Sequence, residues 1–168
     1  MAGLSGSGKS TTAQQLAQLS GAIRLRSDAV RKHLAGLSIH EKGGDEIYTP
    51  EMSDKTYTRL ITLGTTLANR GYRVILDAKF DRAAKRAEAI DSAQANNVPL
   101  TFLHCTAPAE VLRARVTART GDIADATADI LAKQFMEPFS SEATVQVIDT
   151  TQTKTEITHQ LSNTFGLY

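Results

Sequence analysis

The sequence predicts an α/β fold, in which a parallel β-sheet carries helices on both faces. Three observations lead to this prediction. Short apolar stretches typical of buried strands alternate along the chain with longer stretches of helical periodicity. A glycine-rich loop at residues 3–10 leads directly into the first helix. Polar and charged side chains follow the predicted strands, which is where ligands bind in sheets of this kind.

In the first half of the chain, local signals mark where each helix begins and ends. Gly21 is a typical stop for the first helix, and Ser27 can cap the second. The longest helix begins at Thr49-Pro50-Glu51, where a capping hydroxyl, a first-turn proline and an acid occur together. Gly71 ends it. The predicted elements are a helix over 9–19, a strand over 22–26, a helix over 28–35, a mobile loop over 37–48, a helix over 50–70 and a strand over 73–77.

The second half continues the alternation of strands and helices. Pro108 starts one helix, Gly121-Asp122 breaks it, and Pro138 stops the next. Thr153 and Glu156 form a capping box for the last helix. The predicted elements are a helix over 81–96, a strand over 99–105, a helix over 108–120, a helix over 127–136, a strand over 144–148 and a final helix from 154.

Length and composition limit the classes of protein that fit. The 168 residues are typical of one domain, which we expect to span residues 1–168. The formal net charge of +1 argues against binding of long nucleic acid, which favours a strongly basic face. The single cysteine, Cys105, cannot form an internal disulfide, and no apolar run reaches the about 18 residues of a membrane span. We therefore expect a cytoplasmic protein that contacts no membrane.

The glycine-rich loop reads Gly3-Leu4-Ser5-Gly6-Ser7-Gly8-Lys9-Ser10, a complete G-x-x-x-x-G-K-S/T motif. Its glycines let backbone N–H groups surround a polyphosphate, and the positive end of the following helix attracts the same anion. Lys9 is expected to reach the β- and γ-phosphates, and Ser10 to bind Mg²⁺. A chance match within a flexible linker is the alternative. The predicted ligands are ATP and Mg²⁺, and the predicted nucleotide-binding residues are Gly3, Ser5, Gly6, Ser7, Gly8, Lys9, Ser10 and Thr11.

Only Met1 and Ala2 precede this loop in the sequence. A phosphate loop of this kind normally follows a strand that holds its first residue in place. We therefore expect that strand to be missing or truncated, or to come from elsewhere. A missing central strand would leave an apolar slot and unpaired backbone groups in the sheet.

Asp28 and Arg31 follow the strand predicted over 22–26. A carboxylate at this position can accept the proton of a hydroxyl that receives a phosphoryl group, so Asp28 is the candidate catalytic base. Arg31, one turn later, is a candidate for holding an anionic group of the acceptor. The alternative is that Asp28 only complements the helix dipole and that Arg31 is solvated.

Asp77 ends the apolar strand predicted over 73–77 and is the second candidate Mg²⁺ ligand, unless it is a turn or capping residue. Lys79 and Arg82 follow at the same edge and are predicted to bind the acceptor. Phe80 could stack on an acceptor or belong to the core. Asp81 is interpreted as a helix cap.

Arg115 and Arg119 are four residues apart and therefore share one face of a helix. Beside the break at Gly121-Asp122, this pair is typical of a lid that places guanidinium groups on the transferring phosphate and excludes water. The alternative is a solvated basic face. With Lys9 and Asp28, the two arginines complete the set of predicted catalytic residues.

The order of these features resembles that of the P-loop kinases related to polynucleotide kinase and zeta toxin. In addition, Leu76-Asp77-Ala78-Lys79-Phe80 is similar to the LDATF stretch of AAA-type ATP-binding domains fused behind aminoglycoside-phosphotransferase-like domains. Lys79 departs from that pattern, because the group commonly has threonine there. The resemblance implies a three-layer P-loop NTPase fold, a place for adenine between residues 149–155 and the arginine-bearing helix, and membership of a larger fused protein.

These expectations together predict an ATP-dependent kinase that moves the γ-phosphate to a hydroxyl of a small molecule. Three alternatives stay open. The chain could be a polynucleotide 5′-hydroxyl kinase, a zeta toxin-like nucleotide-sugar kinase, or a regulatory module that hydrolyses ATP and has no acceptor. The sequence does not identify the acceptor.

Overall fold

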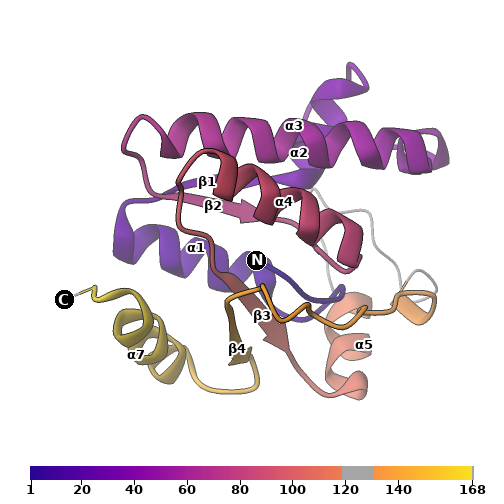
Figure 1. Ribbon diagram of the computed structural model, residues 1–168. Helices are drawn as coiled ribbons and strands as arrows, with labels where there is room; N and C mark the ends of the chain where they lie inside the picture. The colour runs from indigo at the N-terminus through magenta and orange to yellow at the C-terminus, as the bar shows by residue number, and fades with distance from the viewer. Residues whose placement is uncertain (119–130, 168) are drawn as a thin grey trace.

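The computed structural model describes residues 1–118 and 131–167. Helices and strands alternate along this part of the chain (Figure 1). They are α1 (Lys9–Ser20), β1 (Ile23–Arg26), α2 (Ser27–Leu34), the 3₁₀ helix η1 (Asp45–Tyr48), α3 (Pro50–Ala68), β2 (Val74–Asp77), α4 (Ala83–Ala95), β3 (Phe102–Thr106), α5 (Ala109–Thr117), β4 (Val145–Asp149) and α7 (Lys154–Phe165). None of these described helices is long and apolar enough to cross a membrane.

The four strands form two parallel pairs, β1 with β2 and β3 with β4. Residues 1–3 lie between the two pairs and join them. Ala2 forms a parallel bridge with His104 on β3. On the other side, the Met1 amine donates to the Leu76 carbonyl at 2.7 Å, and Gly3 N–H donates to the Lys79 carbonyl at 2.8 Å. Residues 1–3 therefore take the central position in front of the phosphate loop, where the sequence predicted a missing or truncated strand.

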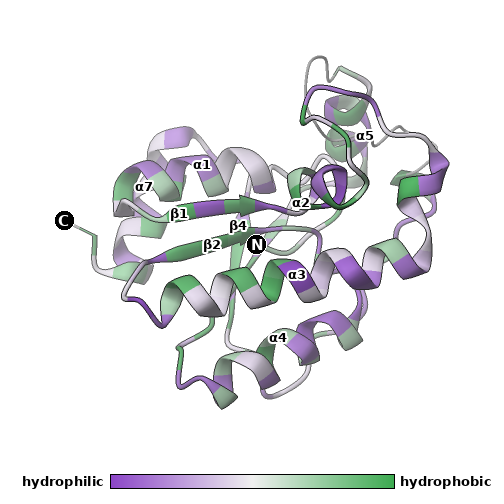
Figure 2. Ribbon diagram, turned by 90° about the horizontal axis from the view of Figure 1, so that it is seen from above, coloured by the Kyte–Doolittle hydropathy of each residue, from purple (hydrophilic) through white to green (hydrophobic). Residues whose placement is uncertain are grey.

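Helices cover both faces of the strands, as predicted. Helices α1 and α7 lie on one side, and α3 and α4 lie on the other (Figures 1 and 2). Between these layers β2 is apolar up to its last residue, Asp77, whereas β1 alternates the apolar Ile23 and Leu25 with Arg24 and Arg26 (Figure 2). This is the three-layer arrangement that the α/β prediction required.

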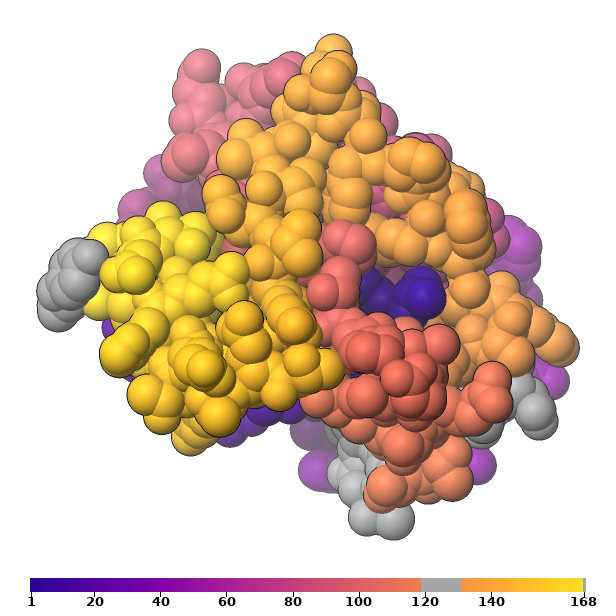
Figure 3. Space-filling view, turned by 90° about the horizontal axis from the view of Figure 1, so that it is seen from below, coloured from indigo at the N-terminus to yellow at the C-terminus, as the bar shows by residue number. Residues whose placement is uncertain are grey.

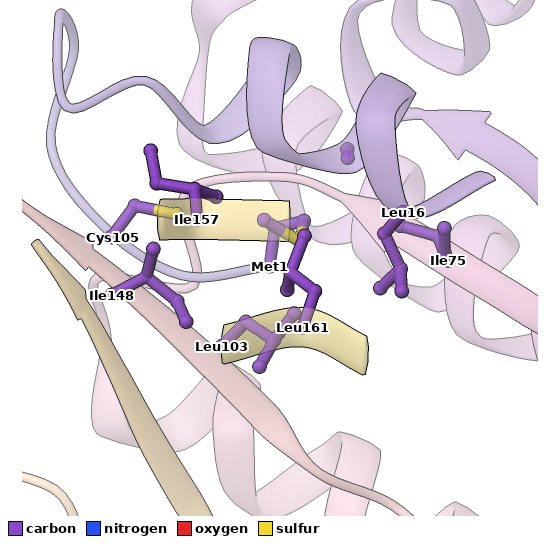
Figure 4. Close-up of a cluster of buried hydrophobic side chains, with 9 residues drawn as sticks. Met1, Leu16, Ile75, Leu103, Cys105, Ile148, Ile157 and Leu161 are labelled. Atoms are coloured by element: carbon purple, nitrogen blue, oxygen red, sulfur yellow. The ribbon is translucent and has the colours of Figure 1, made fainter. Parts of the chain in front are cut away.

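Each side has its own hydrophobic cluster. The first lies between the sheet and the pair α1 and α7, and most of its side chains are drawn in Figure 4. The second lies under α3 and α4 and is rich in aromatic residues. Burying one large apolar side chain stabilises the fold by about 1.5–3 kcal/mol. The first cluster consists of Met1, Ala13, Leu16, Ile75, Leu103, Cys105, Ile148, Ile157 and Leu161, and the second of Ala2, Tyr57, Leu60, Ile61, Ala78, Phe80, Ala89, Ile90 and Phe102.

Two of the predicted helix caps are confirmed. The Thr49 hydroxyl accepts from Met52 N–H at 3.2 Å, and a proline occupies the first turn of α3. Thr153 and Glu156 form the capping box that begins α7. In each case the sequence signal was local, because the capping group and the amide it satisfies lie three residues apart.

Three other local predictions are wrong. Ser27 is the first residue of α2 and not its cap, and Arg26 takes the capping position without a side-chain hydrogen bond. Asp81 does not cap α4, because Glu137, distant in sequence, accepts from the first helical amide, Ala83 N–H, at 2.6 Å. The loop predicted over 37–48 contains η1. The break predicted at Gly121-Asp122 and the first four residues of the helix predicted over 127–136 lie outside the described residues.

Candidate functional site

The phosphate loop joins the central residues 1–3 to α1, and its glycines are fixed by close packing. Gly3, Gly6 and Gly8 have φ values of +136°, +79° and +81°, which favour glycine. A Cβ on Gly6 would lie only 2.5 Å from the Leu112 carbonyl oxygen of α5. The loop therefore needs glycine both for its own conformation and for the backbone packed against it.

Polar groups converge on this loop from inside. Lys9 Nζ donates to the Leu4 carbonyl at 2.7 Å, so the ammonium lies over the first half of the loop. Ser7 Oγ is buried and has no hydrogen-bond partner among the described residues. An unsatisfied buried hydroxyl inside a loop of backbone amides fits the binding of an oxyanion.

Gln134 also contacts the loop, and sequence reasoning missed it. Its amide Nε2 donates to Ser5 Oγ at 2.9 Å, and its Oε1 accepts from Ser5 N–H at 2.9 Å. Gln134 lies in the segment that follows the residues left undescribed, 129 positions from its partner. No motif or periodic signal in the sequence marks such a distant contact.

Ser10 and Asp77 meet at the start of α1 and the end of β2. Ser10 Oγ donates to Asp77 Oδ2 at 3.0 Å, and Asp77 is 5% exposed. Hydroxyl and carboxylate oxygens are the ligands that Mg²⁺ prefers, so these two residues fit the predicted metal site. Their pairing was predicted only from motif order, and the structure places them in direct contact.

Two arginines of β1 also approach this carboxylate. Arg24 donates to Asp77 Oδ2 from Nη2 at 2.5 Å and from Nε at 3.1 Å. Arg26 Nε lies 3.9 Å from the same oxygen. Arg26 pairs with Asp77 in the register of the two strands, and Arg24 lies two residues earlier. Residues two apart share one face of a strand, so this signal was present in the sequence but required the strand order.

The candidate base Asp28 lies in the first turn of α2, close to the end of β2. Burial raises the pKa of the Tyr57 hydroxyl, and the negative charges of Asp81 and Asp28 raise it further. Lys79 Nζ pairs with Asp81 Oδ2 at 3.1 Å. We call Asp28, Lys79, Asp81 and Tyr57 the acceptor edge, after the acceptor site expected there; the roles of Asp28 and Lys79 stay predictions.

Arg31 has partners within the protein. Its Nη1 donates to the Ile47 carbonyl at 3.1 Å and to Ser53 Oγ at 3.3 Å, and its guanidinium stacks over the Tyr48 ring. These contacts join α2 to η1 and α3. Arg31 Nε is buried and has no partner in the described part of the chain. Its predicted contact with an acceptor stays a prediction.

Phe80 belongs to the core and not to a surface that could meet an acceptor. It is 2% exposed, and its ring contacts Tyr57 and Phe102 edge to face at 5.1 and 5.8 Å between ring centres. Its φ of +45° is unusual for a bulky residue. The Tyr57 hydroxyl accepts from Phe80 N–H at 3.2 Å, which helps to hold that conformation.

Arg82 lies at the start of α4, on the surface, where its Nη1 pairs with Glu137 Oε1 at 3.1 Å. Arg86, one turn further along α4, is buried. Its Nη1 donates to the Phe80 carbonyl at 2.7 Å, and its guanidinium stacks on the Phe139 ring. The segment after residue 131 is thus tied to α4 as well as to the phosphate loop. A role for Arg82 in binding an acceptor stays a prediction.

Arg115 lies directly beside the phosphate loop. Its guanidinium donates to Thr150 Oγ1 at 2.8 Å, to the Thr150 carbonyl at 2.7 Å and to the Gly6 carbonyl at 3.4 Å. These bonds join α5, the residues after β4 and the loop. Arg119, the second predicted arginine, lies outside the described residues.

Part of the N-terminal segment that contains the loop is visible on one face of the molecule, although Gly3, Ser5, Gly6 and Ser7 are themselves buried. In Figure 3, indigo atoms of the N-terminal segment form the floor of a hollow between the salmon region of α5 and the orange segment that begins at residue 131. The contacts of Arg115 and Gln134 with the loop come from these two sides. Thus α5 and the segment after 131 form the walls around the phosphate loop.

Several solved structures with a similar fold are described as kinases. A sugar kinase from Janibacter sp. HTCC2649 has a TM-score of 0.70 and 23% identity, with 98% of this chain and 91% of that chain covered. The APS kinase of Mycobacterium tuberculosis, solved with AMPPNP and APS, has a TM-score of 0.72 and 22% identity, with 99% and 93% covered. A gluconokinase from Sinorhizobium meliloti has a TM-score of 0.62 and 24% identity, with 95% and 86% covered. The chain therefore has the P-loop kinase fold.

Curated relatives are longer proteins. Uncharacterized proteins of Mycobacterium tuberculosis and Mycobacterium bovis are 32% identical over 131 residues, which is 76% of this chain and 26% of each relative. The chain thus spans about a quarter of the length of these relatives. A family model described as an AAA domain (AAA_33) matches residues 1–139, and the chain belongs to this family.

Proposed function

We propose that the protein is a kinase that transfers the γ-phosphate of ATP to a hydroxyl group of a small molecule. The observation that carries this proposal is the contact of Ser10 with Asp77 at 3.0 Å beside a complete phosphate loop. In the loop, Lys9 and the backbone amides would hold the β- and γ-phosphates. Mg²⁺, when bound by Ser10 and Asp77, would neutralise charge on these phosphates.

The acceptor edge supports transfer to a hydroxyl. During the reaction, the acceptor oxygen would form a bond to the γ-phosphorus while the bond from that phosphorus to the β-phosphate oxygen breaks. Asp28 would take the proton of the hydroxyl, and ADP would leave. Arg115, which contacts the Gly6 carbonyl, would stabilise charge on the phosphates, and Arg119 would act with it.

A small acceptor is favoured over a nucleic acid. The net charge of +1 provides little attraction for a polyanion, and the acceptor edge carries both signs of charge. The neighbours of the same fold include kinases of a sugar, gluconate and APS. We also propose a cytoplasmic location, where ATP is available, and a role as one module of a longer protein, as in the relatives.

A labelling experiment tests the proposal. The protein is incubated with Mg²⁺ and ATP labelled at the γ-phosphate, together with separate pools of sugars and polyols, nucleotide sugars, or 5′-hydroxyl oligonucleotides. Label in a small-molecule pool, absent with Lys9→Ala, is the expected result. Label only in oligonucleotides, with transfer that weakens steeply as salt rises, would indicate a polynucleotide kinase. Free phosphate alone in every pool would contradict the proposal and favour a regulatory ATPase.

A further inference from the structure

We propose that Arg24 is the counter-ion of Asp77 when no metal is bound, and that it keeps divalent cations out of the site until nucleotide phosphates are present. This inference rests on the proposed use of Ser10 and Asp77 as metal ligands. It concerns a residue of β1 that lies outside the phosphate loop and outside the motif that ends β2.

Several donors share one oxygen atom of Asp77. One carboxylate oxygen, Asp77 Oδ2, accepts from Ser10 Oγ at 3.0 Å and from two nitrogens of Arg24 at 2.5 and 3.1 Å. The guanidinium therefore lies against the same oxygen that the metal site offers. Arg26, at 3.9 Å, adds a second positive charge to that side.

Burial explains why the counter-ion is needed. Asp77 is 5% exposed, and an ionised carboxylate that is buried without a partner is strongly destabilising. The Arg24 side chain is 18% exposed, so the pair is shielded from water on most sides. Without a metal, Arg24 supplies the positive charge beside the buried Asp77 carboxylate and holds its Oδ2 against Ser10.

The same charge opposes a metal. A guanidinium cannot ligate Mg²⁺, so the two cations compete for one carboxylate and repel each other. Nucleotide phosphates change this balance, because they bring negative charge to the loop beside Ser10. The metal and the nucleotide should therefore bind together, and by thermodynamic linkage each should raise the affinity for the other.

Mn²⁺ binding measured by electron paramagnetic resonance tests this role without any enzyme activity. In the absence of nucleotide, Arg24→Gln is expected to bind Mn²⁺ on the order of tenfold more tightly than the wild type. The matched control is Arg26→Gln, which removes a more distant guanidinium and should change the affinity by less than about threefold. Adding Asp77→Asn to Arg24→Gln should abolish the gain, because the carboxylate is the shared partner.

An unchanged Mn²⁺ affinity in folded Arg24→Gln, checked by circular dichroism, would overturn the proposal and leave Arg24 with a structural role alone. If Arg24→Gln does not fold, Arg24→Met is the second neutral variant, because it keeps an apolar side chain of similar length without the charge, and it should show the same gain in Mn²⁺ affinity. An unchanged affinity in folded Arg24→Met would likewise overturn the proposal. Calorimetry of AMPPNP binding to the wild type separates the two ideas, since failure there refutes the kinase proposal and leaves the Mn²⁺ comparison standing.

Discussion

The phosphate loop and the acceptor edge lie at the same end of the sheet but are built in different ways. The loop is made of backbone, fixed by glycines with positive φ and by neighbours as close as the Leu112 carbonyl. The acceptor edge is made of side chains, such as Asp28, Lys79 and Asp81, that come from separate elements. The first arrangement suits a ligand that many proteins share, and the second can vary with each acceptor.

This difference predicts how well each region tolerates substitutions. A backbone cradle tolerates few changes, because each glycine serves conformation and packing together. At the acceptor edge, Asp28 and Lys79 should tolerate substitution better, because neither belongs to a hydrophobic cluster. Changes in the loop should therefore abolish nucleotide use, whereas changes at the edge should alter transfer while nucleotide binding survives.

Loss of Lys9 should have the largest effect. Lys9→Ala removes the ammonium expected on the β- and γ-phosphates, and turnover of ATP should fall on the order of 10³-fold or more. Release of labelled phosphate and product measures it. Lys55→Ala, at an exposed position paired with Glu51, is the matched control and should keep wild-type turnover. Near-normal turnover in Lys9→Ala would contradict the expectation that changes in the loop abolish nucleotide use.

Asp28→Asn should separate transfer from nucleotide binding. Removing a base should slow transfer by about 10²- to 10⁴-fold, while the dissociation constant for AMPPNP changes little. Initial rates and calorimetry measure the two quantities. Asp91→Asn, on the exposed face of α4, is the control. Equal losses of transfer and of nucleotide binding would show that Asp28 is structural.

Two glycines with similar positive φ values but different surroundings test the packing of the loop. Gly6 and Gly21 have φ values of +79° and +65°, but only a Cβ on Gly6 would meet another atom within 4 Å, the Leu112 carbonyl oxygen among them. Gly21→Ala should lower the free energy of unfolding by about 1–2 kcal/mol, from backbone strain alone. Gly6→Ala should cost more and also weaken AMPPNP binding. Urea unfolding of both variants measures the difference, and equal costs would refute the packing argument.

His104, on β3, gives the smallest expected effect and lies outside both regions. Burial, and then the charge of Arg86, lower the pKa of this imidazole in the folded protein. Below the unfolded-state pKa of about 6.5, the unfolded chain binds the proton more readily, so stability should fall as the pH falls from there toward the folded-state pKa.

Thermal unfolding between pH 7 and pH 5 tests this dependence. His104→Gln should show a shallower loss of melting temperature than the wild type, because the proton uptake is removed. His159→Gln, on the exposed side of α7, is the matched control for loss of an imidazole. A wild-type slope in His104→Gln would mean that other groups govern the acid sensitivity.

The sequence predicted the parts of this molecule whose signals are local. The phosphate loop, the caps of α3 and α7, and the alternation of strands and helices each depend on residues close together in the chain, and the structure confirms them. The contact of Ser10 with Asp77 was also foreseen, because it follows from a known motif order.

Features that depend on contacts between distant parts of the chain were not predicted. Asp81 was wrongly interpreted as a cap, because the group that accepts from the first helical amide, Glu137, comes from a segment far along the chain. Gln134 reaches Ser5 from a similar distance. Arg24 could be placed on Asp77 only once β1 was known to pair with β2. Neither periodicity nor composition encodes which strands are neighbours.

The central claim is that the loop at residues 3–10 binds the phosphates of ATP. A crystal structure of the protein with Mg²⁺ and AMPPNP tests it most directly. The account predicts the β- and γ-phosphates inside the loop, Lys9 moved from the Leu4 carbonyl to the phosphates, and the metal between them and the pair Ser10 and Asp77. An empty loop at saturating AMPPNP, or the nucleotide bound in another place, would contradict it.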